Sequence, residues 1–377
     1  MSGVAAVDMA PAFELLAIAT LLAGTLLVLW WWRVRRTASG SRRVALAALT
    51  AFITADLIVF GSFTRLTDSG LGCPDWPGCY GQASPVGAKA AIASAQQALP
   101  TGPVTVSKAW IEMIHRYLAM AVGALILTLT GVLWRTRASL ERAPWWVTAA
   151  LAWVVVQGLF GKYTVTLRLY PIVVTAHLMG GMVLLSLLVA QLQSLRRSPP
   201  LRTARAAAAV LGLVAVQIAL GGWVSSNYAV LACRGFPQCN GQWWPDADFA
   251  QGFALLRELG RSAADGYVEF EALVAIQLVH RGVALLVAAA VIWLAWALRR
   301  GGDHEGRRAA SWLLALLMLQ IGSGLSNVLL DWPLIAALLH TAGAAALVAL
   351  LTSLACRGAS SPSARPLAEP ALRQHRA

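Results

Sequence analysis

Nine long apolar stretches, separated by polar connections, dominate the pattern of hydrophobic and polar positions along this chain. A helix needs about 20 apolar residues to cross the hydrocarbon core of a bilayer. An open sheet cannot satisfy its backbone hydrogen bonds in lipid, so each stretch predicts a membrane-spanning helix and the chain an all-α integral membrane protein. The predicted helices cover residues 12–32, 43–64, 108–134, 145–164, 171–193, 204–225, 271–298, 309–328 and 334–355.

The composition agrees with this pattern and excludes a soluble domain. The chain has 377 residues, of which 58% are hydrophobic and 12% charged, and its mean hydropathy is +0.65. Soluble globular proteins carry about 25% charged residues. The net charge of +13 would fit a nucleic-acid partner only if the basic residues formed a surface patch, and they do not.

The basic residues instead follow alternate connections between the predicted helices. The more basic connections hold 16 Lys and Arg, in residues 33–43, 135–142, 196–205 and 299–308. The other connections are longer in total but hold 8, in residues 65–108, 160–170 and 226–270. Positive residues favour the cytoplasmic side. The pattern therefore predicts a multi-pass protein of a bacterial-type inner (plasma) membrane, with its N-terminus and long loops outside and its C-terminus cytoplasmic. We expect no nucleic-acid partner.

Both ends of the chain lie outside the repeated part described below. Residues 1–42 predict an extra N-terminal transmembrane helix with a basic linker, and residues 1–11 lack the Lys and Arg of a signal peptide. We expect this helix to be uncleaved. Residues 357–377 are rich in Pro, Ser and Ala and predict a disordered cytoplasmic tail.

An internal repeat organises the rest of the chain into two halves. Cys73 and Cys79 recur as Cys233 and Cys239, 160 residues later. "EMIHR" at 112–116 matches "QLVHR" at 277–281, and "VVTAHLMGG" at 173–181 matches "ALLHTAGAA" at 337–345. Each half has four predicted helices, an even number, so the two halves share one orientation and form a parallel repeat. We expect two four-helix bundles, an eight-helix core, from residues 43–200 and 201–356.

Each half carries two histidines, on its second and fourth predicted helices. His115, His177, His280 and His340 all lie six to ten residues into helices that enter from outside, roughly 10 Å deep at 1.5 Å per residue. Matched imidazole pairs inside helix bundles are typical of axial haem ligands. A histidine that only bonds a neighbouring helix, and a zinc site, are the alternatives. Zinc sites usually need three or four protein ligands, and apart from Glu112 in the first half neither half supplies a further ligand at this depth.

Two arginines directly follow the first histidine of each pair. Arg116 and Arg281 would lie within the membrane, where a buried guanidinium needs an anion. The carboxylates of haem propionates are suitable partners. We therefore expect both arginines to bind cofactor, the alternative being that they extend toward the outer headgroups.

One acid distinguishes the halves. Glu112 precedes His115 by three residues, and its counterpart before His280 is Gln277. An intramembrane carboxylate is costly unless it is used or paired. Glu112 can act as a base or stabilise positive charge, or form an ion pair with an arginine such as Arg65. We expect the first half to hold a haem that is changed and the second a haem that transfers electrons. A second intramembrane acid, Asp56, has no role that the sequence decides.

The two cysteine pairs lie in the predicted outer loops, where disulfides form. A spacing of six residues around a turn with proline is compatible with bonds Cys73–Cys79 and Cys233–Cys239. We expect the second pair to be structural. The first pair belongs to the half with Glu112, so either a catalytic or a structural role is open for it.

Together these motifs resemble the haem A synthase family, of the CtaA type. The resemblance spans residues 43–355 and includes "FTRLTDSGLGCPDWPGCYG", "CRGFPQC" and the histidine motifs above. It implies an oxidoreductase that acts on a CH group and converts the C8 methyl of haem O to the formyl of haem A. It also implies haem B on His280 and His340, and the substrate near His115 and His177. Glu112, with Cys73 and Cys79, would support the reaction.

The family resemblance also implies partners. Haem O would come from a haem O synthase, the product would serve cytochrome oxidase assembly, and the electron acceptor is not identified by the sequence. Three other functions remain as alternatives: a dihaem cytochrome b that transfers electrons, a haem carrier without catalysis, and a transporter. Glu112 separates haem A synthesis from these alternatives, because electron transfer and haem carriage need no catalytic acid.

Overall fold

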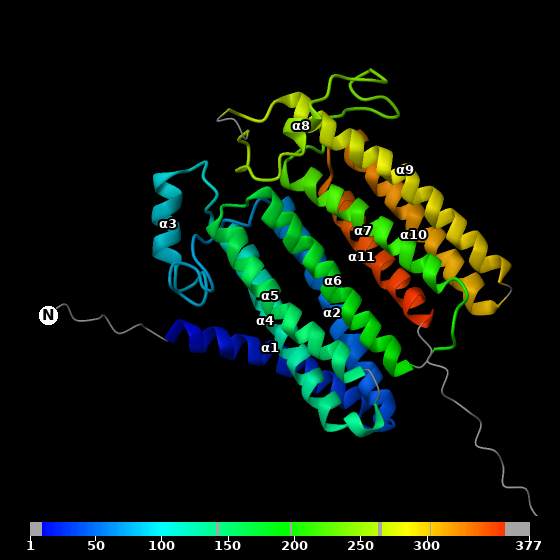
Figure 1. Cartoon of the computed structure of the whole chain (residues 1–377). Helices are drawn as coiled ribbons and strands as arrows, with labels where there is room; N and C mark the ends of the chain where they lie inside the picture. Colours follow the sequence, from blue (N-terminus) through cyan, green and yellow to red (C-terminus); the bar gives the residue numbers. More distant parts are fainter. Residues whose placement is uncertain (1–9, 141–142, 197, 263–265, 302, 359–377) are drawn as a thin grey trace, which may run out of the picture.

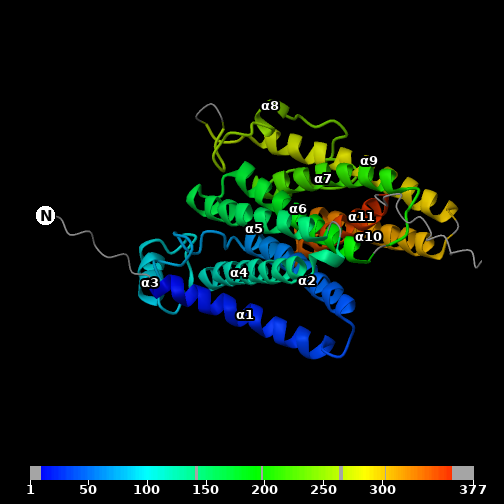
Figure 2. The same ribbon diagram turned by 60° about the horizontal axis from the view of Figure 1, so that its bottom comes forward.

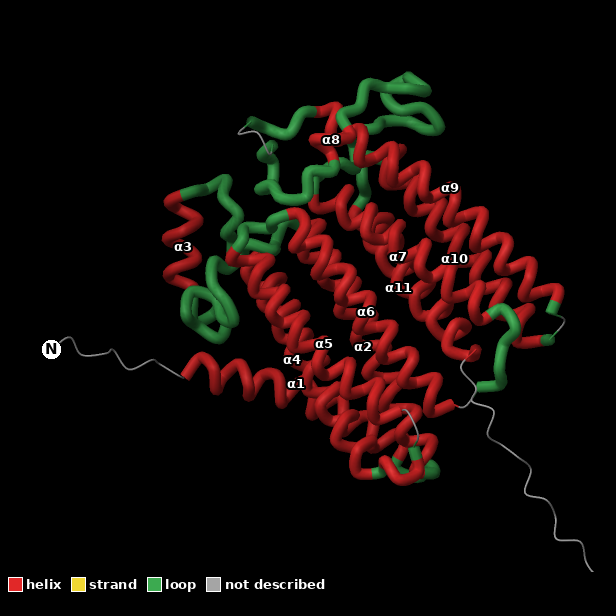
Figure 3. The backbone as a smooth tube through the Cα atoms, viewed as in Figure 1, coloured by secondary structure: helices red, strands yellow, loops and turns green. Residues whose placement is uncertain are grey.

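The computed structural model describes residues 10–140, 143–196, 198–262, 266–301 and 303–358. Within these ranges the chain is helical and contains no strand longer than an isolated bridge (Figures 1 and 3). The expected tail beyond residue 358 lies outside the described residues. Nine of the described helices are long and apolar enough to cross a membrane, which confirms the predicted all-α, multi-pass membrane protein. They are α1 (Ala10–Val34), α2 (Ser39–Leu66), α4 (Val106–Arg135), α5 (Ala143–Thr166), α6 (Pro171–Arg196), α7 (Ala204–Ser226), α9 (Phe270–Arg300), α10 (His304–Leu329) and α11 (Leu334–Ala355).

Several helix starts follow from local capping chemistry. The Thr105 side chain accepts a hydrogen bond from Lys108 N at the start of α4, and Asp303 accepts one from Gly306 N at the start of α10. Such side chains satisfy backbone N–H groups that have no partner inside the helix. Pro171 begins α6, where its missing N–H costs nothing.

The first four-helix bundle consists of α2, α4, α5 and α6. Helix α2 packs against α4 and α6, and α5 packs against the same two helices, so α4 and α6 occupy diagonal corners. The second bundle repeats this arrangement with α7, α9, α10 and α11, and places α9 and α11 on the diagonal. Figure 2 shows the bundles side by side. The helices predicted to carry histidines are therefore the diagonal pair in each bundle.

The bundles join along α2, α6, α7 and α11. Helix α2 of the first bundle packs on α11 of the second, and α6 of the first packs on α7 of the second. Helices α6 and α11 also contact each other. These paired contacts are those expected of two repeats related by a twofold axis. One apolar core runs through both bundles and includes Leu46 and Leu188 of the first and Leu294 and Leu351 of the second. Hydroxyl pairs Ser62–Thr341, at 2.9 Å, and Thr175–Ser226, at 3.1 Å, cross the interface. Helix α1 packs outside the first bundle, against α4 and α2.

Two long loops lie beyond the same end of the bundles, which we call the loop end (Figure 1). Residues 67–105 contain the helix α3 (Lys89–Ala98). Residues 227–269 contain only the short α8 (Phe249–Gly252) among their described residues. The short 3-10 helices η1 (Arg137–Ser139) and η2 (Cys356–Gly358) lie in connections at the opposite end.

Candidate functional site

The four histidines lie inside the two bundles, near the loop end. His115 is nine residues from the start of α4 and His280 ten from the start of α9, while His177 and His340 are each six residues into α6 and α11. The two helices of each pair occupy diagonal corners of their bundle, so both imidazoles lie near the same end of it. Each bundle thus presents two half-buried imidazoles to one another from diagonal helices, at a depth of about 10–15 Å.

A glycine on a third helix faces each imidazole. A Cβ atom at Gly61 would lie 3.0 Å from Cε1 of His115, and one at Gly161 would lie 3.7 Å from Cε1 of His177. In the second bundle the distances are 3.2 Å from Gly221 to His280 and 3.3 Å from Gly324 to His340. Sequence reasoning missed these glycines. A signal was available, because they recur at offsets of 160 and 163 residues, as the cysteines and the second histidines do.

This arrangement fits a haem ring between each pair of imidazoles. Nδ1 of His115 and Nδ1 of His177 are buried without a partner in the part of the chain that the structure describes, although buried polar atoms normally have one. No group of three or more His, Cys, Asp and Glu side chains that could hold a metal ion occurs among the described residues. Two facing imidazoles match the number of axial ligands that a haem takes and are too few for an ordinary zinc site.

The second histidine pair has side-chain partners that the first pair lacks. Ser323 Oγ lies 3.0 Å from Nδ1 of His340. Nε2 of Gln217 lies 3.1 Å from Nδ1 and 3.3 Å from Nε2 of His280. In the first bundle, the Phe60 ring stacks on His115 at 6.3 Å between ring centroids. The two bundles therefore surround their imidazoles with different chemistry.

Glu112 is buried, with 3% of its surface exposed, and joins α4 to the first loop. Its Oε2 accepts a hydrogen bond of 2.8 Å from Cys73 N, and its Oε1 forms an ion pair of 2.5 Å with Arg116. The arginine considered from sequence, Arg65, pairs with Asp68 instead, at 3.2 Å. Gln277 occupies the equivalent place in the second bundle and donates to Val230 O at 2.6 Å. The carboxylate is thus held between the disulfide loop and the arginine next to His115.

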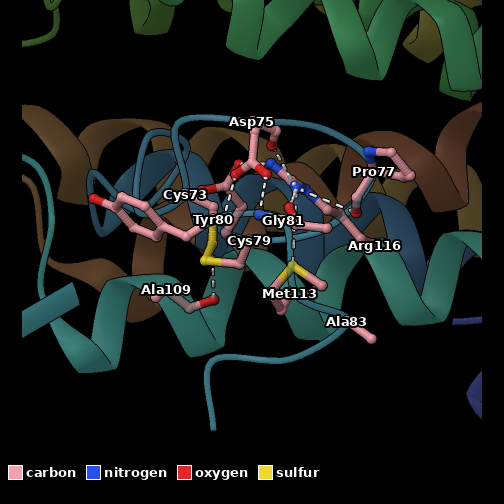
Figure 4. Close-up of a disulfide and its surroundings, with 12 residues drawn as sticks. Cys73, Asp75, Pro77, Cys79, Tyr80, Gly81, Ala83, Ala109, Met113 and Arg116 are labelled. Carbon is pink, nitrogen blue, oxygen red and sulfur yellow. Dashed lines mark hydrogen bonds and ion pairs between the residues drawn. A yellow bond between two sulfur atoms is a disulfide. The ribbon is translucent and has the colours of Figure 1, made fainter. Parts of the chain in front are cut away.

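Arg116 and Arg281 turn toward the loops in the same way. Arg116 donates to Asp75 O at 2.8 Å, to Pro77 O at 3.3 Å and to Gly78 O (Figure 4). Arg281 donates to three carbonyls of the second loop: Cys233 O at 2.6 Å, Gly235 O at 3.1 Å and Gln238 O at 3.4 Å. Each guanidinium fastens a loop over its bundle. The expected contact with haem propionates stays a prediction.

Both expected disulfides are present at the loop end. Cys73–Cys79 and Cys233–Cys239 each span six residues. All four cysteines are buried, at 0–2% exposed, so these loops shield their sulfur atoms from solvent. In the first loop Asp75 accepts hydrogen bonds from Tyr80 N and Gly81 N, at 2.6 and 2.7 Å (Figure 4). The disulfide and Glu112 therefore belong to one bonded unit, in which Cys73 is common to both.

Asp56 stands apart from this unit. It is exposed near the middle of α2, and has no hydrogen bond or ion pair with any residue that the structure describes. The structure brings Glu112, Cys73, Cys79, Arg116 and the first histidine pair to one end of one bundle, and does not bring Asp56 to them.

Comparison with known proteins agrees with this arrangement. The sequence model of the COX15-CtaA family, described as cytochrome oxidase assembly protein, matches residues 45–352. A protein of Shewanella oneidensis named Heme A synthase is 37% identical over 318 residues, covering 82% of this chain and 94% of that protein. Proteins of the same name from Rhizorhabdus wittichii and Caulobacter vibrioides are each 30% identical, over 330 and 343 residues, covering 80% and 84% of this chain and 90% and 96% of those proteins. The match spans both bundles and both disulfide loops, so the chain belongs to the COX15-CtaA family of cytochrome oxidase assembly proteins.

Proposed function

We propose that this protein is a haem A synthase, which oxidises the C8 methyl group of haem O to a formyl group. One observation carries the proposal: two facing histidine pairs lie at matched depth, and only the first has a carboxylate beside it. The relatives named Heme A synthase align with 80–82% of this chain. The first bundle is the site of substrate oxidation, and the second holds a resident haem B.

The chemistry requires oxidation, oxygen and proton transfer. Conversion of a methyl group to a formyl group with water as the oxygen source releases four electrons and four protons. Glu112 lies one helical turn from His115, so its carboxylate is placed to take up protons or to stabilise positive charge that develops near the substrate. Arg116 and Cys73 N hold the carboxylate in position, which favours a preorganised site over a flexible one.

His280 and His340 would hold haem B in the second bundle. A haem held by two imidazoles is suited to electron transfer, and in the second bundle Gln277 stands where the first bundle has a carboxylate. The helices α6 and α11 meet between the bundles, so electrons from the first site have a short protein path to the second. Arg116 and Arg281 remain candidates for contact with haem propionates, in addition to the loop carbonyls that they bind.

The same proposal includes an orientation in the membrane. The loop end faces the periplasm, because the basic connections lie at the opposite end and positive residues favour the cytoplasm. The disulfides then lie in an oxidising compartment. Haem O would reach the first bundle from a haem O synthase, and haem A would pass to cytochrome oxidase assembly.

Expression in a host that makes haem O but no haem A tests the proposed function. Haems extracted from the purified protein are separated by mass, and we expect haem A beside haem B. A His115→Ala variant in the same host should bind haem B without making haem A. If folded wild-type protein supplied with an electron acceptor holds haem B and leaves haem O unchanged, the protein is an electron-transfer cytochrome or a carrier and the proposal fails.

A further inference from the structure

We propose that Gln217 and Ser323 are positioning residues, which hold the second histidine pair for a resident haem. We further infer that their apolar counterparts Leu57 and Phe160 leave the first pair free to release its haem. This inference rests on the proposed function, because it assigns a resident haem to one bundle and a haem that enters and leaves to the other.

Ser323 fixes the ring of His340. Ser323 Oγ lies 2.6 Å from Leu319 O, to which it donates its only proton. The hydroxyl can then only accept from Nδ1–H of His340, which lies 3.0 Å away. With the proton on Nδ1, the lone pair of Nε2 is free for iron. Hydrogen bonds of this kind orient a ligating imidazole and raise its basicity.

Gln217 plays the same part for His280. Its Nε2 lies 3.1 Å from Nδ1 of His280 and 3.1 Å from the backbone oxygen of the same residue. Its Oε1 is buried without a partner among the described residues. An iron-bound imidazole donates its Nδ1–H, so in the haem-loaded protein a half-turn of the amide brings Oε1 to accept this proton, and the bond from Nε2 to His280 O is given up. The side chain has no other polar partner among the described residues, so His280 determines its position.

The repeat identifies the counterparts of these two residues without ambiguity. Gln217 precedes Gly221 by four residues, as Leu57 precedes Gly61. Ser323 directly precedes Gly324, and Phe160 directly precedes Gly161. The glycines fix the register because each faces a histidine in the structure.

The effect of the apolar counterparts is seen at the imidazole nitrogens of the first histidine pair. Nδ1 of His115 and Nδ1 of His177 are buried without a hydrogen-bond partner among the described residues. By the register of the repeat, the same place next to the imidazole is polar in the second bundle and apolar in the first. Loss of a partner of this kind typically weakens metal binding 10–100-fold. A bundle whose haem is substrate and product has to release it at every turnover, whereas a resident haem has to stay.

Haem transfer to excess apomyoglobin measures this difference. The purified full-length protein carries His115→Ala, so that haem B in the second bundle is observed alone. We expect Gln217→Leu with Ser323→Ala to speed haem B loss about 10-fold or more. The midpoint potential should also rise, because a less basic imidazole stabilises ferric iron less. Ser326→Ala is the matched control on α10, since the Ser326 hydroxyl bonds only Gly322 O among the described residues. Ser323→Thr, which keeps a hydroxyl, should restore slow loss and so exclude a folding defect.

The reverse change tests the first bundle. Leu57→Gln in otherwise unmodified protein should slow transfer of the more rapidly lost haem several-fold. Equal rates and potentials for the Gln217/Ser323 double variant and Ser326→Ala would overturn the role of these two residues, and an unchanged rate for Leu57→Gln would overturn the inference about release. Failure of the proposed function gives a different result: haem A is absent in the wild-type host experiment while the effects on haem B loss persist.

Discussion

The two bundles of this protein are built alike around their histidines and differ in the residues that touch them. Each places its imidazoles on diagonal helices, opposite glycines, beneath a loop closed by a disulfide. Each also uses an arginine next to a histidine to fasten that loop. The arrangement of two imidazoles, two glycines and a closed loop is therefore present twice.

Three pairs of side chains near the imidazoles and loops differ in chemical character. In the order first bundle then second, the pairs are Glu112 and Gln277, Leu57 and Gln217, and Phe160 and Ser323. The first bundle has the acid and lacks polar partners for its imidazoles, and the second has the partners and lacks the acid. Divergence of this kind separates a bundle suited to chemistry and exchange from one suited to retention.

The largest expected effect comes from Glu112→Gln, which gives the first bundle the residue of the second. We expect haem A formation to fall about 100-fold or more, because a positioned acid–base group typically contributes 10²–10⁴-fold. Haem B should be retained, since Gln277 shows that an amide fits this place in the fold. Haem A produced per folded protein is the measurement.

The reciprocal variant Gln277→Glu is the matched control for this prediction. It adds a carboxylate to the second bundle, beside Arg281, and should leave haem A formation within about twofold of wild type. If Glu112→Gln retains full conversion, the carboxylate serves only to anchor Arg116 and Cys73 N, and its proposed role in the reaction is wrong.

Removal of each disulfide in turn should show which of the two loops contributes to haem A formation. Cys73→Ser with Cys79→Ser releases the backbone N–H that donates to Glu112, so we expect about a tenfold loss of haem A formation. Cys233→Ser with Cys239→Ser should lower thermal stability to a similar extent and leave the yield of haem A per folded protein nearly unchanged. Equal losses of activity in the two double variants would mean that both loops are structural.

An alanine in place of a glycine tests the cradle of each imidazole. A Cβ at Gly61 would come within 3.0 Å of His115 and has to displace it, whereas the 3.7 Å at Gly161 is an ordinary contact with His177. We expect Gly61→Ala to reduce haem binding in the first bundle several-fold, and Gly161→Ala to have little effect. Both changes are on helices, where alanine is favoured over glycine, so backbone propensity does not explain a loss. Binding is followed by haem stoichiometry and the absorption of the bound haem.

The transmembrane helices could be predicted from sequence because hydropathy alone determines them. Their ends could not be predicted to the residue. The apolar window 43–64 understates α2, which begins at Ser39. The helix continues through Arg42 and Arg43 because long basic side chains can reach the headgroups from inside a helix. The repeat followed from the spacing of its motifs. The sequence left open whether the two histidine helices of each half are diagonal or adjacent, and helix packing places them on the diagonal.

The surroundings of the imidazoles could not be predicted in the same way. Gln217 and Ser323 are isolated polar residues in apolar helices, and the sequence does not say which face of the helix each occupies. The ion-pair partner of Glu112 could not be predicted from the sequence either. Arg65 and Arg116 were both possible partners, and only the folded structure shows that Arg116 forms the pair. Contacts between helices decide these features, and hydropathy carries no information about them.

The smallest expected effect concerns the place where the two repeats touch at the loop end. Asp68 and Tyr228 are equivalent positions, 160 residues apart, and the Tyr228 hydroxyl donates to Asp68 Oδ1 at 2.6 Å. Arg65 lies over the Tyr228 ring, 4.1 Å from its centroid, and donates to Ser225 O at 2.6 Å. These contacts cross the interface at its solvent-exposed edge. The hydrogen bond therefore contributes about 1 kcal/mol or less to stability.

Tyr228→Phe should lower the midpoint of thermal unfolding by about 2 °C without affecting haem content. Burial raises the pKa of Tyr228, against the lowering influence of the Arg65 guanidinium. A raised pKa keeps the hydroxyl protonated, so the bond is fully formed below the ordinary tyrosine pKa of about 10 and is lost only as pH rises through the higher folded value. The difference between Tyr228→Phe and wild type should thus be constant from about pH 6 to 9. Tyr163→Phe, at an exposed tyrosine of α5, is the control. An unfolding difference that vanished by pH 9 would mean that the hydroxyl ionises early and that the contact between the two repeats rests on Arg65 alone.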